Sequence, residues 1–416
     1  MRKWVILACL AGFAAYWASS IVNWWTHPIA VFLGRRTFWW DAEDFTVFYA
    51  AGTLASRGDF DHLYAADVHA QIQLPLLVGH HEPLGFYNPP VFSLLFLPFS
   101  WLPFDLAFQA WTGLNLALVA VVCVLLWHIT GRIDRAYRLA IILGFLTLYP
   151  LTFGLRLGQF SLLLTASWAA AFLFLRSGRD RAAGLALTPL FIKPELLIPI
   201  TIFLAWKKRW AALRVLFPAA VLAAAMSVAL VGPRGAWDYA GYIASASGDG
   251  SGNMYGWNGL LSSVFAPDDP GSMTAYGLPL AMITLGCAAY LWAGAVDTGG
   301  SMFPVQWLAL TLGTILWDAH FYLQDLIILA PAVAAVIASA TEWRAWLAGA
   351  GAMVGWVILG LGNVPSAIWG FNILAACMVG CIVLLVIWKA GARFMGRRVM
   401  TSDTAGRVYV LETEAA

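Results

Sequence analysis

A cluster of carboxylates stands at the start of the first long polar stretch in an otherwise apolar sequence. The stretch opens with DAEDFTVFYAAG, which puts Asp41, Glu43 and Asp44 directly before a run of aromatic and small residues. A carboxylate beside an apolar wall can have its basicity raised toward neutral pH, where it removes a proton from a hydroxyl group efficiently. Asp44 is therefore our candidate general base, with Asp41 and Glu43 as neighbouring substitutes. The structural alternative is that Asp44 caps a helix near Thr46–Ser56.

A lysine interrupts the apolar stretch 182–205 at its middle, in the order Lys193, Pro194, Glu195. An ionisable group at such a place is costly, so it is usually functional or paired. Lys193 is therefore either a binding group for an anion such as phosphate or the partner of Glu195 in a local ion pair. Both interpretations remain open from the sequence.

Three further polar positions suit anion chemistry. Arg156 is the one basic residue at its predicted turn, where it either binds a phosphate through two N–H groups or extends to the membrane interface. Gln159 follows at the start of the next predicted helix. His320 lies in WDAHFYLQD, between Asp318 and Asp325, and can donate to a phosphate or take part in proton transfer. A structural role for this histidine is the alternative.

The composition is that of an integral membrane protein. Hydrophobic residues make up 61% of the 416 residues and charged ones 11%, with a mean hydropathy of +0.76. Such a chain has too little polar surface to cover a soluble globule. The net charge of +2 excludes a nucleic-acid-binding stripe. The 22 Trp residues are typical of belts at the two membrane interfaces. We therefore predict an all-α, polytopic membrane protein.

Hydropathy predicts a series of apolar segments, two of which do not suit a plain spanning helix. The stretch 89–103 is only about fifteen residues, roughly 22 Å as a helix, and it contains four prolines. The stretch 182–205 is broken at Lys193. We predict that both are short re-entrant helical hairpins, which leaves about ten full spans. The segments lie near 4–23, 89–103, 106–130, 139–155, 159–175, 182–205, 211–231, 273–294, 303–317, 321–340, 345–361 and 367–388.

The distribution of positive charge supports this arrangement. With a cytoplasmic N-terminus, most of the 24 Lys and Arg residues fall in cytoplasmic loops, as the positive-inside rule requires. Treating both short stretches as full spans spreads the charges more evenly and leaves Lys193 within the membrane. The basic residues predicted outside are Arg35, Arg36, Arg57, Arg156, Lys193 and Arg234.

We predict one transmembrane domain over residues 1–388, followed by a cytoplasmic tail over 389–416. Residues 24–88 are expected to form the first outer loop and residues 232–272 the second, with both termini cytoplasmic. No internal repeat is evident, which weakens a transporter interpretation, because many transporters are built from repeats.

Several short motifs occur in an order that resembles glycosyltransferase family 87. Members of this family are polyprenol-phosphate-mannose-dependent α-mannosyltransferases of the glycosyltransferase-C superfamily. The resemblance extends from about residue 40 to about residue 215. The motifs are an aspartate shortly before VFYAAG, then GDFDHLY, FYNPP, LGQFSLLL, AGLAL followed by IKP, and the basic loop WKKRW.

The resemblance implies an inverting transfer of a sugar from a lipid-phosphate donor on the non-cytoplasmic face. It implies that Asp44 is the base and that His320 is the histidine of a later outer turn. The departing phosphate needs cations or hydrogen-bond donors, for which we assign Lys193, Arg156 and Gln159. The candidate sugar or acceptor contacts are Asp41, Tyr49, Tyr87, Asn88, Trp257 and Asn258.

No metal and no other cofactor is predicted. His80, His81 and Glu82 resemble a metal cluster only loosely, because consecutive side chains rarely converge on one ion. The lipid-linked sugar counts as a substrate.

The sequence therefore predicts a glycosyltransferase-C-like bundle in the inner (plasma) membrane, acting on the periplasmic or outer face. The expected donor is a polyprenyl-phosphate sugar, with mannose as the sugar that the family resemblance implies, and the expected acceptor is a lipid- or polymer-linked glycan. The alternatives are a transferase for arabinose, glucose or galactose, a glycan ligase that uses a lipid-pyrophosphate donor, and a lipid or solute transporter.

Overall fold

The computed structural model describes residues 18–36, 41–77, 83–246, 254–266, 270–293, 298–339 and 372–397, and in these ranges it is helical with no strand. The α-helices after an initial helix at residues 18–32 are α2 (Glu43–Ser56), α3 (Ala66–Gln73), α4 (Ser93–Ser100), α5 (Phe104–Ile129), α6 (Arg135–Leu146), α7 (Tyr149–Leu157), α8 (Ser161–Arg176), α9 (Asp180–Ala186), α10 (Leu197–Trp206), α11 (Trp210–Ala246), α12 (Trp257–Phe265), α13 (Thr274–Trp292), α14 (Met302–Trp317), α15 (Leu329–Ser339) and α18 (Ile373–Arg397). Short 3-10 helices are η1 (Phe60–His62), η2 (Pro90–Phe92), η3 (Thr188–Ile192), η4 (Pro194–Leu196), η6 (Pro270–Met273) and η7 (Leu323–Ile328).

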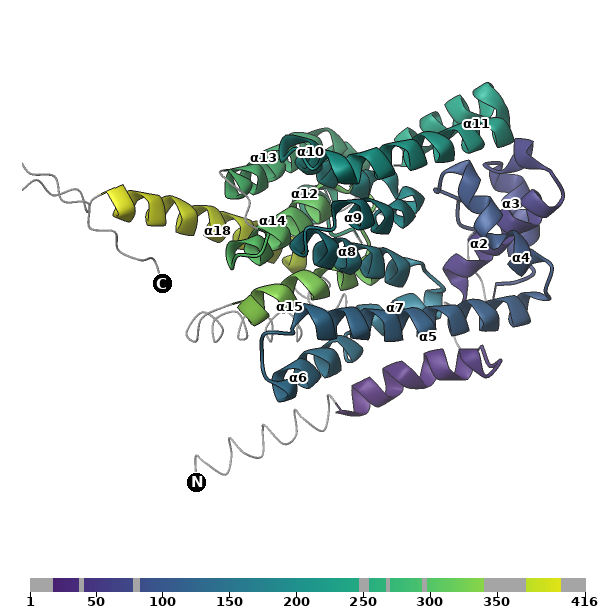
Figure 1. Cartoon of the computed structure of the whole chain (residues 1–416). Coiled ribbons are helices and arrows are strands. Elements are labelled where there is room, and N and C mark those ends of the chain that lie inside the picture. Colours follow the sequence, from purple (N-terminus) through teal and green to yellow (C-terminus); the bar gives the residue numbers. More distant parts are fainter. Residues whose placement is uncertain are drawn as a thin grey trace, which may run out of the picture.

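The helices form an elongated bundle (Figure 1). At one end of the bundle lie α2, α3 and α4, together with the last turns of α11. At the other end lie α6, α13 and the end of α18. The all-helical membrane fold that the sequence predicts is confirmed at this level, and we refer to the first end as the α2 end.

Within the described residues, four helices are long and apolar enough to cross a membrane, or five if the bent pair α6 and α7 counts as one span. The four are Phe104–Ile129, Trp210–Ile243, Ala275–Trp292 and Ile373–Ala390. Large apolar side chains on them face outward, among them Phe217 and Leu384, as a lipid-facing surface requires. The predicted count of about ten full spans is not confirmed. Its segment 345–361 lies outside the described residues, as do 1–17, His80 to Glu82 and the tail beyond residue 397.

Two helices extend further than hydropathy indicated. The first helix continues to residue 32, so residues 24–32 of the predicted outer loop are helical. α11 runs past the predicted end at 231 and on to Ala246. Gly232, with a φ of 71°, breaks its backbone, and Pro233 follows. Residues 233–246 thus belong to a helical extension, which we call the distal arm of α11, rather than to an irregular loop.

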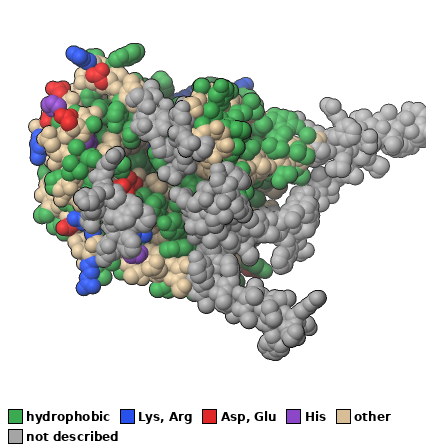
Figure 2. Space-filling view, turned by 180° about the vertical axis from the view of Figure 1, so that it is seen from behind, with side chains coloured by type: hydrophobic (Ala, Val, Ile, Leu, Met, Phe, Trp, Pro, Cys, Tyr) green, Lys and Arg blue, Asp and Glu red, His purple; other side chains and the backbone are tan. Residues whose placement is uncertain are grey.

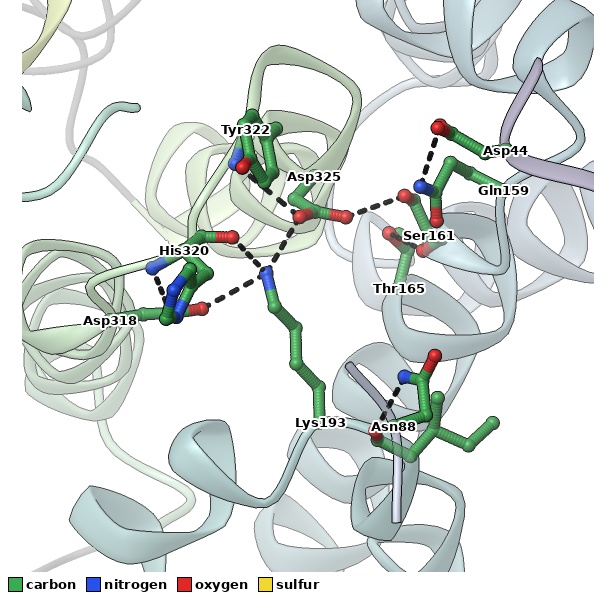
Figure 3. A network of polar contacts seen from close by, with 11 residues as sticks. Asp44, Asn88, Gln159, Ser161, Thr165, Lys193, Asp318, His320, Tyr322 and Asp325 are labelled. Atoms are coloured by element: carbon green, nitrogen blue, oxygen red, sulfur yellow. Dashed lines mark hydrogen bonds and ion pairs between the residues drawn. The ribbon is translucent and has the colours of Figure 1, made fainter. Parts of the chain in front are cut away.

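The predicted hairpin at 182–205 has the shape that the sequence suggested. α9 leads into η3, the chain turns at Lys193, and η4 and α10 return. The two ends meet, because Arg209 after α10 pairs with Asp180 at the start of α9 (Nη1 to Oδ1, 3.3 Å). Pro189 and Pro194 each occupy the first turn of a 3-10 helix, where a missing N–H costs nothing. From the tip, the Lys193 side chain points toward Asp318, His320 and Asp325 (Figure 3).

The segment 89–103 is also too short to span. α4 has only eight residues, about 12 Å at 1.5 Å per residue, and it packs on α2. A Cβ at Gly52 of α2 would lie 2.5 Å from the carbonyl oxygen of Phe96 in α4, so the two backbones touch. Only glycine permits this approach, and the contact fixes α2 at the end of the bundle.

The basic loops that the sequence assigned to the cytoplasm meet at the end opposite α2. Arg132, after α5, donates to the carbonyl of Gly299, before α14 (3.2 Å). Lys389 of α18 donates to the last carbonyls of α13, at Tyr290 and Leu291. In Figure 2, by contrast, exposed charges of both signs gather where the α2 end lies, and hydrophobic side chains cover much of the remaining visible face.

A buried aromatic core fills the bundle between the two ends. Trp168 and Phe172 of α8 pack against Phe303 and Trp307 of α14, with the Trp168 and Trp307 ring centroids 4.9 Å apart and those of Phe172 and Phe303 5.3 Å apart. The indole N–H of Trp168 donates to Thr311 (2.9 Å). Among the described residues, this core separates the polar groups at the α2 side from the basic loops.

Candidate active site

Asp44 lies in the first turn of α2, and its half-buried carboxylate accepts a hydrogen bond from the Gln159 side chain (Oδ2 to Nε2, 2.7 Å). α2 begins at Glu43 with no side-chain cap, so Asp44 does not cap the helix. Ala42, which precedes α2, adopts a φ of 72°, a value that is unusual for a residue with a side chain. The backbone N–H of Ala42 donates to the carbonyl of Arg156 (2.8 Å), and this hydrogen bond ties α2 to α7.

A second set of contacts holds Gln159 opposite Asp44. Phe45 stacks on Trp111 of α5, and the Trp111 N–H donates to the carbonyl of Gly158 (2.6 Å). Gly158 ends α7 with a φ of 80°, and a Cβ there would lie 2.6 Å from that of Phe45. A glycine is therefore needed at this turn, and the turn aims Gln159 at the carboxylate.

Burial raises the pKa of Asp44 from its usual value near 4 to about 7, and the negative charges of Glu43 and Asp325 add to the effect. The hydrogen bond from Gln159 favours the ionised form and opposes the rise. A carboxylate whose pKa lies near the working pH is both available and basic enough to take a proton from a hydroxyl group.

Lys193 is buried, and its ammonium group lies against three acceptors. It donates to the carbonyl of His320 (2.7 Å) and to Asp325 Oδ2 (2.8 Å), and it pairs with Asp318 Oδ2 at 3.1 Å. The side chains of Asp318 and Asp325 are 0% and 7% exposed. The sequence offered Glu195 as the ion-pair partner, whereas the structure provides two aspartates from the link between α14 and α15.

Asp325 connects this ion cluster to α8. Its second oxygen, Oδ1, accepts a hydrogen bond from Ser161 (2.6 Å). Ser161 stands two residues after Gln159, in the LGQFSLLL motif, so one short segment contacts both Asp44 and the ion cluster (Figure 3). The structure thus brings together Asp44, Gln159, Lys193 and the backbone of His320 in one polar network.

The sequence analysis did not assign Ser161, Asp318 or Asp325 to the site. Two of these residues carried a signal. Asp318 and Asp325 are carboxylates that flank His320 in an apolar stretch of the sequence, and Lys193 is a lysine in another apolar stretch. A pair of buried opposite charges is the ordinary way to satisfy both. Ser161 carried none, since a serine at a helix start is common.

The FYNPP motif reaches the hairpin tip. The Asn88 amide donates to the carbonyl of Ile192, next to Lys193 (2.9 Å), and the Tyr64 hydroxyl donates to the carbonyl of Asn88 (2.9 Å). The Tyr87 ring stacks on the imidazole of His320, with centroids 6.2 Å apart. Tyr87 and Asn88 therefore adjoin the network, and their assignment to sugar or acceptor stays a prediction.

Arg156 and Asp41 form a separate buried pair beside the start of α2. The Arg156 Nε lies 3.2 Å from Asp41 Oδ1, and the two side chains are 7% and 0% exposed. The sequence analysis assigned one to phosphate and the other to sugar, whereas the structure joins them to each other. Their charges offset one another next to Asp44.

Three other candidates make contacts outside the network. The Tyr49 hydroxyl donates to the carbonyl of Leu102 (2.8 Å), where it packs α2 against the α4 to α5 link. The Trp257 N–H donates to Thr284 of α13 (2.8 Å). Asn258 is buried against Gly277 of α13. Their assignment to sugar or acceptor stays a prediction.

One group of side chains has the composition of a metal site. Ligand atoms of Glu195, Asp318 and His320 lie within 4.8 Å of one another. The donor set suits a divalent ion, but the Lys193 ammonium already pairs with Asp318 at 3.1 Å. A cation entering there would have to compete with a fixed positive charge.

Comparison with known proteins gives one match. A family model described as glycosyltransferase family 87 matches residues 86–316, which is more than half of the chain. No curated protein and no solved structure matches. The matched range contains Gln159 and Lys193; Asp44 precedes it and His320 follows it.

Replacing Lys193 by methionine should strongly destabilise the fold. The change leaves Asp318 and Asp325 buried without their counter-charge, which we expect to lower the free energy of unfolding by about 3–5 kcal/mol. Arg209→Met is the matched control, since it removes a more exposed pair with Asp180 and should cost about 1 kcal/mol or less. Unfolding in detergent measures both. Adding Asp325→Asn to Lys193→Met should recover part of the loss. Equal effects of the two single changes would contradict the importance of the buried cluster.

Proposed function

The chain belongs to glycosyltransferase family 87 and is a membrane glycosyltransferase, and from this premise we propose a specific reaction. It transfers a sugar, mannose first among the candidates, from a polyprenyl-phosphate donor to a lipid- or polymer-linked acceptor, with inversion at the anomeric carbon. The observation that carries the proposal is the half-buried Asp44 carboxylate, with a pKa of about 7 and one amide donor oriented on it.

In the proposed reaction Asp44 accepts the proton of the acceptor hydroxyl as its oxygen attacks the anomeric carbon. The new bond joins the acceptor oxygen to that carbon, and the bond between the carbon and the donor phosphate breaks. The polyprenyl phosphate leaves with the electron pair. Gln159 fixes the orientation of the carboxylate, which keeps the accepting oxygen in place.

The departing phosphate needs positive potential and hydrogen-bond donors. We assign contact with it to the imidazole of His320, which stacks beside Tyr87 at the hairpin tip. The ammonium of Lys193 faces three protein acceptors, so its first role is to hold the turn that carries His320. Lys193 and Arg156 contribute positive potential. Either side chain can contact the phosphate directly only after it has released the aspartate with which it is paired.

The arrangement of polar groups favours an enzyme over a transporter. A transporter needs a polar path that is accessible from both sides of the membrane, whereas an enzyme can keep its polar groups on one side. The network around Asp44 and Lys193 is separated from the basic loops by the aromatic core of Trp168, Phe172 and Trp307 among the described residues.

The meeting of the basic loops at the opposite end of the bundle supports a topology. We propose that those loops and both termini are cytoplasmic, by the positive-inside rule. The site around Asp44 then faces the periplasm or cell exterior from the inner (plasma) membrane. Sugars other than mannose, namely arabinose, glucose and galactose, remain candidates, because sugar selection depends on a few hydrogen bonds.

The test is a transfer assay with purified protein in lipid, offered a panel of polyprenyl-phosphate sugars and a membrane extract as acceptor. Asp44→Asn should lower the rate by about 10²–10⁴-fold, the usual contribution of a general base. The amide can still accept the Gln159 hydrogen bond, so folding should be kept. Glu43→Gln, one residue away on the same turn, is the control and should retain most activity. If both variants were equally active, Asp44 would not be the base.

The rate should also follow the titration of Asp44. The base acts in its ionised form, so activity should rise with pH through about 7 and level off above it. Gln159→Ala removes the hydrogen bond that stabilises the ionised carboxylate, which should move this rise to higher pH. The pH profile of the transfer rate at saturating donor measures both. If the rise stayed at the same pH in Gln159→Ala, the pH profile would not report the titration of Asp44.

We propose that the transfer needs no metal ion, because the Lys193 ammonium supplies the positive charge between Asp318 and Asp325. Chelator treatment of protein and substrates should leave the rate unchanged, and added Mg²⁺ or Mn²⁺ should not raise it. Loss of activity with chelator and recovery with Mn²⁺ would instead assign an ion to the group formed by Glu195, Asp318 and His320.

A further inference from the structure

A stack of three rings runs from the distal arm of α11 to His320. The rings of Tyr242 and Tyr87 have centroids 5.2 Å apart and planes inclined by 14°. The rings of Tyr87 and His320 are 6.2 Å apart and inclined by 18°. Because the three rings are stacked with nearly parallel planes, a change in the orientation of the Tyr242 ring should change that of the Tyr87 ring, and through it that of the His320 imidazole.

The backbone of His320 is already fixed by polar contacts. Its carbonyl accepts from Lys193 (2.7 Å), and its N–H donates to Asp318 (2.8 Å). These contacts fix the backbone, and stacking on Tyr87 adds a contact on the face of the ring that favours one ring plane. Near-parallel aromatic pairs attract one another beyond the effect of area burial, which favours one rotamer.

The distal arm is tied to this region through tyrosines. The Tyr239 hydroxyl donates to the backbone carbonyl of Tyr87 (3.4 Å). The Tyr64 ring packs on both Tyr239 and Tyr242, at 5.1 and 5.6 Å. Since the backbone of α11 breaks at Gly232, the arm takes its direction from these contacts as well as from the helix before it.

Gly85 makes the approach of Tyr242 possible. A Cβ added at Gly85 would lie 1.8 Å from the Tyr242 hydroxyl oxygen, 3.1 Å from the ring carbon that bears it and 3.1 Å from the corresponding carbon of Tyr87. The severe collision is with the Tyr242 hydroxyl, so a methyl group at residue 85 would displace the Tyr242 ring most, and it would also press on the Tyr87 ring. The position therefore gives a means to move the stack without removing any aromatic ring.

We propose that Tyr242 is a positioning residue for the transfer reaction. Through Tyr87 it holds the imidazole of His320 in the orientation that meets the departing phosphate. This inference rests on the proposed function for the role of His320, but the ring stack itself does not. Its consequence is that a helix end distant in sequence from Asp44 and Lys193 sets the rate of the chemical step.

The decisive variants are Gly85→Ala, Tyr242→Phe and the two combined. Gly85→Ala should lower kcat by about 10- to 100-fold, the order expected for a small misplacement of a reacting group, with a smaller change in the donor KM. Tyr242→Phe keeps the ring and is the reference for the double variant. The double variant removes the hydroxyl that collides with the new methyl, so it should recover most of the lost kcat. Trp237→Ala, on the same arm but 79% exposed, is the control for the arm itself.

A second measurement follows the stack without any reaction. Ring currents of Tyr87 shift the Hε1 resonance of His320, which is assigned in histidine-labelled protein by its loss in His320→Asn. The resonance should move in Gly85→Ala and return in the double variant. An unmoved resonance in Gly85→Ala would overturn the stack, and a moved resonance with unchanged kcat would overturn the positioning role. Parent protein that transfers no donor sugar would instead defeat the proposed function, and the resonance would still decide the stack.

Discussion

The buried ammonium group of Lys193 is the constraint on which the rest of the site depends. A charge at that depth is tolerated only if its partners are close and well oriented, because an unpaired buried charge costs several kcal/mol. Its partners come from the link between α14 and α15, and Asp325 in turn accepts from Ser161 of α8. The tip of the hairpin, the turn that carries His320 and the start of α8 therefore adopt their positions together.

The base is positioned by a different kind of force. α2 is held by close packing, through the contact of Gly52 with α4 and the stacking of Phe45 on Trp111. The packed helix α2 and the ion cluster around Lys193 are connected through residues 159–161: Gln159 contacts Asp44, and Ser161 contacts Asp325. A rigid apolar platform and a buried ion cluster thus share one short segment, and that segment fixes the distance between the base and the groups near His320.

Much of the candidate site was predictable because its residues are charged or polar within an apolar sequence. Asp44, Lys193 and His320 stand out in a hydrophobic sequence, and the proline-flanked lysine indicated a hairpin. The partners were not predictable, since Lys193 and Asp325 are separated by 132 positions and Arg156 and Asp41 by 115. The extension of α11 beyond residue 231 was missed because Gly232 and Pro233 are ordinary signals for a helix end, and the helix resumes after them.

The charge balance of the site bears on the choice of donor. Asp318 and Asp325 both pair with Lys193, so carboxylates outnumber the ammonium group even before Asp44 is counted. Repulsion from this surplus grows with the charge of an incoming anion. A lipid phosphodiester carries a single negative charge, whereas a lipid pyrophosphate carries more, and the described residues provide no additional cation next to Lys193. The same surplus raises the basicity of Asp44 through Asp325. A site that repels highly charged donors while strengthening its base favours a monophosphate-linked sugar over the pyrophosphate donor of a ligase.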